Sequence, residues 1–165
     1  MIKMLRFDDR LIHGQIAINW SKMMSIQMIV IANDGIAKDK TQVMVLKMAA
    51  PPGMKCSVLS IEDTIKNVTD PRAKNMAIMV ITNNFPDTLA IVKGAKDEIE
   101  RVNLGNNTIV DTHTTGMKAL TQYVYVSESD IEICKELLTL GVPVDLQLRP
   151  ELPYLSLEDA LKQLK

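Results

Sequence analysis

Four residues close to the amino terminus have the chemistry needed to handle a phosphoryl group: Asp9, Arg10, His13 and Gly14. A neutral imidazole accepts a phosphoryl group through a nitrogen lone pair, so His13 is a candidate nucleophile. Arg10 carries a permanent charge on a planar fork of donors, which suits phosphate oxygens better than an ammonium group does. Gly14 lets the backbone approach those oxygens closely. These residues predict a phosphoryl-transfer loop over positions 8–15.

The segment that follows, Gln15 to Met24, is predicted to form a helix entered at Gly14, which places His13 beside a helix N-terminus. The positive end of the helix disfavours an imidazolium ion, and its free N–H groups hold the phosphoryl oxygens after transfer. Asp8 or Asp9 could orient the imidazole by accepting its second N–H, or could instead hold Arg10 in place. The sequence leaves that choice open.

Each of these residues also has an ordinary structural role that competes with the catalytic one. A lone histidine is often a structural residue whose hydrogen bonds are satisfied. Asp8 and Asp9 suit a turn or a helix N-cap, and Arg10 suits the solvated surface. Their joint placement directly after an apolar strand favours the catalytic interpretation. The second histidine, His113, lies in a polar stretch and is interpreted as a solvated loop residue.

Short apolar, β-branched runs alternate with amphipathic, capped segments along the whole chain, which predicts βα units around a mainly parallel sheet. The expected strands are Ile2 to Phe7, Ile26 to Ala32, Met54 to Leu59, Met76 to Thr82, Arg101 to Leu104, Tyr123 to Val126 and Val142 to Leu148. Right-handed crossovers bring the loops after these strands to one edge of the sheet, where ligands of open α/β sheets bind. We expect an α/β fold, a single domain over 1–165, with an open, twisted, mainly parallel sheet of about seven strands and helices on both faces.

Helix boundaries are marked by hydroxyl, proline and glycine residues. Ser60, Ser127 and Ser156 each stand three residues before an acid, the spacing of a capping box. Pro86 suits the first turn of a helix, and Gly141 suits the left-handed residue that closes one.

Composition excludes several classes of function. Nineteen basic and twenty acidic residues give a formal charge of -1, with no basic run, so nucleic acid is not an expected partner. Apolar runs are much shorter than the about 18 residues of a membrane span, and no secretory signal is recognised. Cys56 and Cys134 lie far apart, without metal-ligand spacing, and are expected to be buried, reduced thiols of a cytoplasmic protein. No metal and no cofactor is expected.

At the first loop the sequence resembles the IIB proteins of the mannose-fructose-sorbose family of sugar phosphotransferase systems. Their signature R-I-D-D-R-L-I-H-G-Q is matched by Arg6 to Gln15, with Phe7 in place of isoleucine as the one departure. Shorter segments that resemble the family lie at Trp20, Ala50 to Gly53, Ile81 to Asn83 and Val124 to Asp130, so the similarity covers the whole chain. Family members commonly have a Gly-Gly pair after the fifth strand, where this chain has Gly105 alone.

The resemblance implies a phosphoryl relay by a protein-phosphohistidine-sugar phosphotransferase. The phosphohistidine of a IIA domain gives its group to Nδ1 of the residue matching His13, which passes it to a sugar entering through the membrane subunits IIC and IID. The family arginine corresponds to Arg10. The resemblance thus implies a cytoplasmic protein, peripherally associated with the membrane through IIC and IID, and leaves a homodimer open.

Three other classes of function compete with this one. A receiver domain would need a phosphoacceptor aspartate after the third strand and a lysine after the fifth, where Ser60 and Asn106 or Asn107 stand. A non-catalytic binding module would carry no covalent phosphate. A metal-dependent hydrolase built on the acids of the first loop is disfavoured, because adjacent acids on a turn need not converge on one ion.

Overall fold

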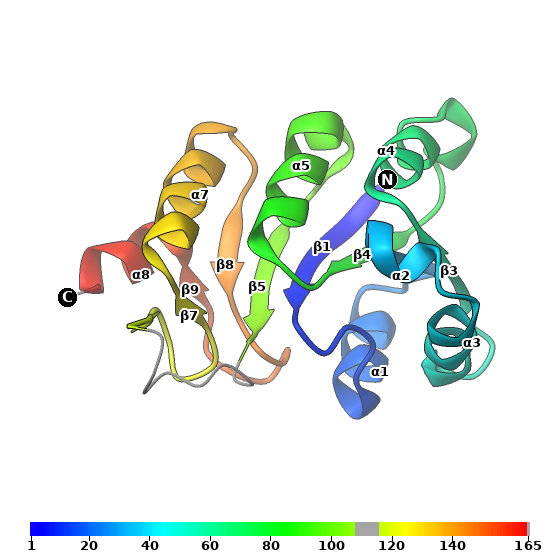
Figure 1. Ribbon diagram of the computed structural model, residues 1–165, viewed down its shortest axis with the longest axis horizontal. Coiled ribbons are helices and arrows are strands. Elements are labelled where there is room, and N and C mark those ends of the chain that lie inside the picture. Colours follow the sequence, from blue (N-terminus) through cyan, green and yellow to red (C-terminus); the bar gives the residue numbers. More distant parts are fainter. Residues whose placement is uncertain (108–115, 165) are drawn as a thin grey trace.

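The first strand, β1 (Ile2–Asp8), lies at the centre of a seven-stranded sheet. The computed structural model describes residues 1–107 and 116–164. The other strands of this sheet are β2 (Met28–Ala32), β3 (Lys55–Leu59), β4 (Ile78–Thr82), β5 (Val102–Asn106), β8 (Val144–Leu146) and β9 (Leu155–Ser156). Their order is β3-β2-β4-β1-β5-β8-β9, and all neighbours are parallel except β8 and β9 (Figure 1). The predicted fold class is confirmed.

The prediction that Tyr123 to Val126 forms a strand of the main sheet is wrong. Only Tyr125–Val126 is extended, as β7, and it pairs with β6 (Lys118–Ala119) in a separate two-stranded sheet. The side chain of Asn107 bonds both backbone groups of Tyr125, at 2.6 and 2.7 Å, and so replaces a neighbouring strand there. The seventh strand of the main sheet is instead β9, which has two residues and is too short to show an alternating pattern in the sequence.

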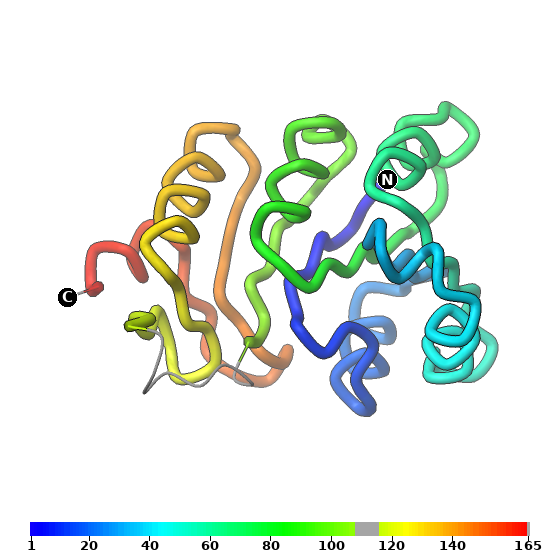
Figure 2. Tube along the Cα trace, in the orientation of Figure 1, coloured from blue at the N-terminus to red at the C-terminus, as the bar shows by residue number. Residues whose placement is uncertain are grey.

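Helices cover both faces of the main sheet (Figure 1). They are α1 (Gly14–Met23), α2 (Asp34–Ala37), α3 (Lys40–Ala49), α4 (Ile61–Val68), α5 (Phe85–Ala95), α7 (Glu128–Thr139) and α8 (Leu157–Gln163). Ser60, Ser127 and Ser156 cap α4, α7 and α8 as predicted, and the capping box is complete at Ser127. In the trace, the dark-blue β1 runs through the middle of the molecule and the red α8 lies at one side (Figure 2).

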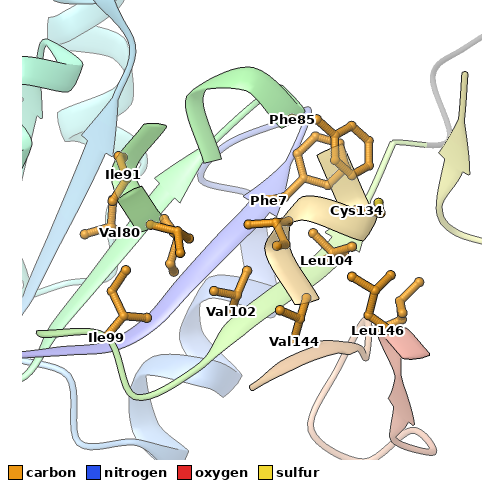
Figure 3. Packing of buried hydrophobic residues seen from close by; sticks show 14 of the residues in the cluster. Phe7, Val80, Phe85, Ile91, Ile99, Val102, Leu104, Cys134, Val144 and Leu146 are labelled. Atoms are coloured by element: carbon orange, nitrogen blue, oxygen red, sulfur yellow. The ribbon is translucent and has the colours of Figure 1, made fainter. Parts of the chain in front are cut away.

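The two faces of the sheet carry separate apolar clusters. The larger one joins the sheet to α4, α5, α7 and α8, and includes Phe7 and Phe85, whose ring centroids lie 4.4 Å apart (Figure 3). The smaller one lies under α1 and is built around the fully buried Trp20. β1 contributes to both clusters, so the residues that follow it leave the sheet from a fixed, central position.

Candidate active site

His13 is the residue that caps the N-terminus of α1. Its backbone is extended, with φ -137° and ψ 96°, and its half-buried side chain makes no capping hydrogen bond to the described chain. The first turn of α1 contains no acid. The imidazole therefore lies beside a helix end whose partial positive charge is not offset by an acid of that turn.

Gly14, the next residue, is in the left-handed region with φ +45°. Glycine adopts this conformation at little cost, and the space around it is open, because a Cβ built there meets no atom within 4 Å. Gly14 and Gln15 are both exposed, so the start of the helix faces outward.

Two apolar side chains anchor the loop between β1 and α1. Leu11 and Ile12 are buried in the smaller apolar cluster, whereas Asp9, Arg10 and His13 are only half-buried. The Leu11 backbone is left-handed with φ +59°, and its N–H donates to the Asp8 carbonyl at 3.0 Å. The polar residues of the loop are thus more exposed than its two apolar residues.

Asp8 and Asp9, which the sequence did not separate, have different surroundings. The Asp8 carboxylate is buried and accepts hydrogen bonds from the Arg6 guanidinium at 2.9 Å and from the Arg10 backbone N–H at 3.1 Å. Asp9 lies against the end of β5: its N–H donates to the Asn106 carbonyl at 3.0 Å, and its carboxylate accepts from the Asn106 amide at 3.4 Å. Asp8 thus holds the backbone of Arg10.

A buried polar group below the loop was missed from the sequence. It consists of Arg6 and Asp8 on β1, Asn103 on β5 and Asp145 on β8, all almost completely buried. Burial lowers the pKa of Arg6, and the adjacent Asp8 carboxylate opposes that shift. Polar residues at every second position of these strands were the available signal.

Other features of the chain do not converge on this loop. A cavity of about 240 Å³ beside the ends of β5 and β8 is lined by none of the residues 8–15. His113, expected in a loop, falls outside the described residues. Among the described residues no cluster of three or more His, Cys, Asp and Glu side chains is suited to a metal ion. In the same part of the chain, no helix has the length and apolar character to cross a membrane.

The two cysteines are free thiols in different environments. Burial, with a smaller contribution from Asp130, raises the pKa of Cys134 to about 12. Burial also raises the pKa of Cys56, but this side chain is half-buried, so the prediction that both thiols are buried holds only for Cys134. Neither thiol is activated as a nucleophile, because the reactive species is the thiolate.

Comparison with known proteins identifies relatives that match 85% or more of the chain. The sorbose-specific EIIB component of Klebsiella pneumoniae is 33% identical over 162 residues, covering 98% of this chain and 96% of that protein. A probable phosphotransferase enzyme IIB component of Streptococcus pyogenes serotype M6 is 40% identical over 141 residues, covering 85% and 86% of the two chains. The crystal structure of the IIBSor domain of the Klebsiella pneumoniae sorbose permease superposes with a TM-score of 0.87 at 33% identity, over 99% of this chain and 97% of that one.

The family model agrees with these relatives. The model that describes the sorbose subfamily IIB component of the phosphotransferase system matches residues 2–165. This match confirms the resemblance seen at Arg6 to Gln15 and sets aside the receiver domain. The chain therefore belongs to the sorbose-subfamily IIB components of the sugar phosphotransferase system and is a phosphotransferase subunit.

Proposed function

We propose that His13 is the phosphoryl acceptor of this IIB component. In the first step, the Nδ1 lone pair attacks the phosphorus of a phosphohistidine on a IIA partner, forming a new P–N bond as the old one breaks. In the second, a sugar hydroxyl attacks the same phosphorus, the bond to His13 breaks, and the hydroxyl proton is released. The observation that carries this proposal is the position of His13 as the N-cap of α1.

Arg10 and Gly14 are proposed to bind the phosphoryl oxygens. The Arg10 guanidinium offsets charge on the transferring group, while the backbone at the start of α1 donates hydrogen bonds to it. Asp8 supports this assignment because it fixes the backbone from which the Arg10 side chain projects. We assign Asp9 an orienting role toward the imidazole or the guanidinium, since its contacts with Asn106 keep it at the same edge of the sheet.

The proposed partners are a IIA domain, the membrane subunits IIC and IID, and a sugar. The mannose-specific EIIAB component of Escherichia coli, 29% identical over 164 residues, combines A and B parts in one protein, and this chain covers 49% of it. A IIA domain is the corresponding donor for this chain. Delivery to a sugar in transit places the protein at the cytoplasmic side of the membrane, associated with it through IIC and IID.

The chemical stability of the phosphorylated protein tests the proposal. The chain is incubated with radioactive phosphoenolpyruvate, the general proteins of the phosphotransferase system and a IIA domain, and the labelled protein is then treated with acid or with base. We expect loss of label in acid and survival in base, as for phosphohistidine. Loss in base as well as in acid would indicate an aspartyl phosphate and would contradict the assignment.

A further inference from the structure

One face of the main sheet changes character at β1. On β2 and β4 this face is apolar and lies in the cluster around Trp20. On β1, β5 and β8 the same face carries Arg6, Asp8, Asn103 and Asp145, each no more than 2% exposed. Burying such groups costs free energy unless each one finds hydrogen-bond partners.

These side chains form one continuous hydrogen-bonded chain. Two nitrogens of Arg101 donate to the two carboxylate oxygens of Asp145, at 2.6 and 2.8 Å. The Asn103 amide donates to Asp145 at 2.8 Å and accepts from the Arg6 guanidinium. Arg6 donates in turn to Asp8 at 2.9 Å. The last link leaves the sheet, because the second Asp8 oxygen accepts the backbone N–H of Arg10 at 3.1 Å.

Gly105 provides the space that Arg6 needs. A Cβ at position 105 would lie 2.3 Å from Cζ of Arg6 and 2.4 Å from its Nη2. A flexible side chain could swing away, but this guanidinium is tied to Asn103 and Asp8. Any side chain at position 105 therefore displaces the group that holds the Asp8 carboxylate.

The energetics of burial indicate that the ion pair between Arg6 and Asp8 serves the geometry of the loop rather than stability. A buried ion pair gains little net stability over well-packed apolar residues of the same volume, because desolvation offsets the attraction. Removing one partner is costly, however, because the other charge is left buried and alone. The Asp8 carboxylate needs Arg6 in order to remain where the loop uses it.

We propose that Arg6 and Gly105 are positioning residues for phosphoryl transfer. Arg6 holds the Asp8 carboxylate, which fixes the path of the chain through Arg10 to His13, and Gly105 leaves room for the guanidinium. This inference rests on the proposed role of His13 as acceptor. Neither residue touches the reacting atoms, so both act on the rate through the placement of the loop.

Two glycine substitutions separate positioning from a purely structural role. Gly105→Ala clashes with Arg6, whereas Gly94→Ala clashes with Ile65 between α5 and α4, where its Cβ would lie 2.6 Å from Cδ1. We expect both variants to melt at lower temperature. In single-turnover transfer from phosphorylated IIA, only Gly105→Ala should lose maximal rate, by about 10- to 100-fold, with its half-saturating IIA concentration within about twofold of wild type.

Variants of Arg6 itself test the same link between the guanidinium and the Asp8 carboxylate. Arg6→Met should lower the maximal rate by about tenfold or more, and Arg6→Lys should recover part of it. The double variant Arg6→Met/Asp8→Asn should be faster than Arg6→Met, because asparagine still accepts the Arg10 N–H without leaving a buried charge. Lys3→Met, which removes an exposed ion pair of β1 with Glu100, is the matched control and should transfer at the wild-type rate.

The outcomes distinguish the two proposals. If folded Gly105→Ala or Arg6→Met protein has a wild-type maximal rate, the positioning role is overturned. The role of His13 as phosphoryl acceptor is not affected by that result. An equal loss of rate in Gly94→Ala and Gly105→Ala would also overturn it, because the loss would then follow stability rather than the loop. Absence of phosphohistidine in the wild-type protein would instead overturn the proposed function.

Discussion

The backbone N–H of Arg10 donates a 3.1 Å hydrogen bond to the Asp8 carboxylate, two residues earlier in the chain. This contact shows that Asp8 supports the backbone of the loop. From the sequence, Asp8 could instead have oriented the imidazole of His13. Any residue except proline keeps the contact at position 10, because the donor is the backbone N–H. Substitutions of the Arg10 side chain therefore test chemistry without removing this support of the loop.

Replacing Arg10 with lysine is expected to slow phosphoryl transfer by about tenfold, with little change in melting temperature. Lysine retains the charge but lacks the planar fork that binds two phosphate oxygens together. The measurement is single-turnover transfer from phosphorylated IIA. Arg149→Lys, at an exposed arginine paired with Glu151, is the control and should be neutral. A wild-type rate in Arg10→Lys would remove Arg10 from the proposed site.

Asp9→Asn is expected to reduce the rate of transfer while leaving stability nearly unchanged. Asparagine still accepts the hydrogen bond from Asn106, and the substitution removes the negative charge. The control is Asp97→Asn, at an exposed aspartate before the amino end of β5. If the two variants transfer at the same rate as wild type, Asp9 does not orient the imidazole or the guanidinium.

The order of elements was predictable because buried parallel strands and capped helices alternate in the sequence. Ser127 and Asp130, for example, form the capping box that their spacing predicts. The failure at Tyr123 to Val126 has a local cause: Asn107 supplies the hydrogen bonds that a strand neighbour would provide. A side chain that takes the place of a neighbouring strand leaves no alternating pattern in the sequence.

The candidate site was predictable only where its residues are neighbours in sequence. His13, Gly14, Arg10 and the acids before them lie within one loop, so their types could be read together. Arg6 meets Asn103 only because β5 lies beside β1. The alternation of strands and helices along the sequence does not determine the order of the strands within the sheet. The hydrogen-bonded series of buried polar side chains was therefore recognised only in the structure.

Gly14→Ala is expected to destabilise the protein by about 1 kcal/mol, because φ +45° is unfavourable for alanine. Gly53→Ala is a matched control: Gly53 has φ +77°, and a Cβ at either glycine meets no atom within 4 Å. Both variants should lose similar stability in chemical denaturation. Only Gly14→Ala should also slow phosphoryl transfer, since it alters the start of α1. Equal rates in the two variants would argue against phosphate binding at Gly14.

The thiol of Cys134 is expected to resist alkylation in the folded protein. Because its pKa is raised to about 12, the thiolate fraction at pH 8 is on the order of one in ten thousand. Iodoacetamide followed by mass spectrometry should label Cys56 first and Cys134 only after unfolding. Rapid labelling of native Cys134 would show that the α7 face is not packed as described.

The site of phosphorylation tests the central claim most directly. Wild-type protein, His13→Gln and His113→Ala are phosphorylated through IIA, and the modified residue and ring nitrogen are identified by NMR of protein labelled with ¹⁵N-histidine. We predict one phosphoryl group on Nδ1 of His13 in the wild type and in His113→Ala, and none in folded His13→Gln. A phosphoryl group on His113, or one that persists in His13→Gln, would contradict the account.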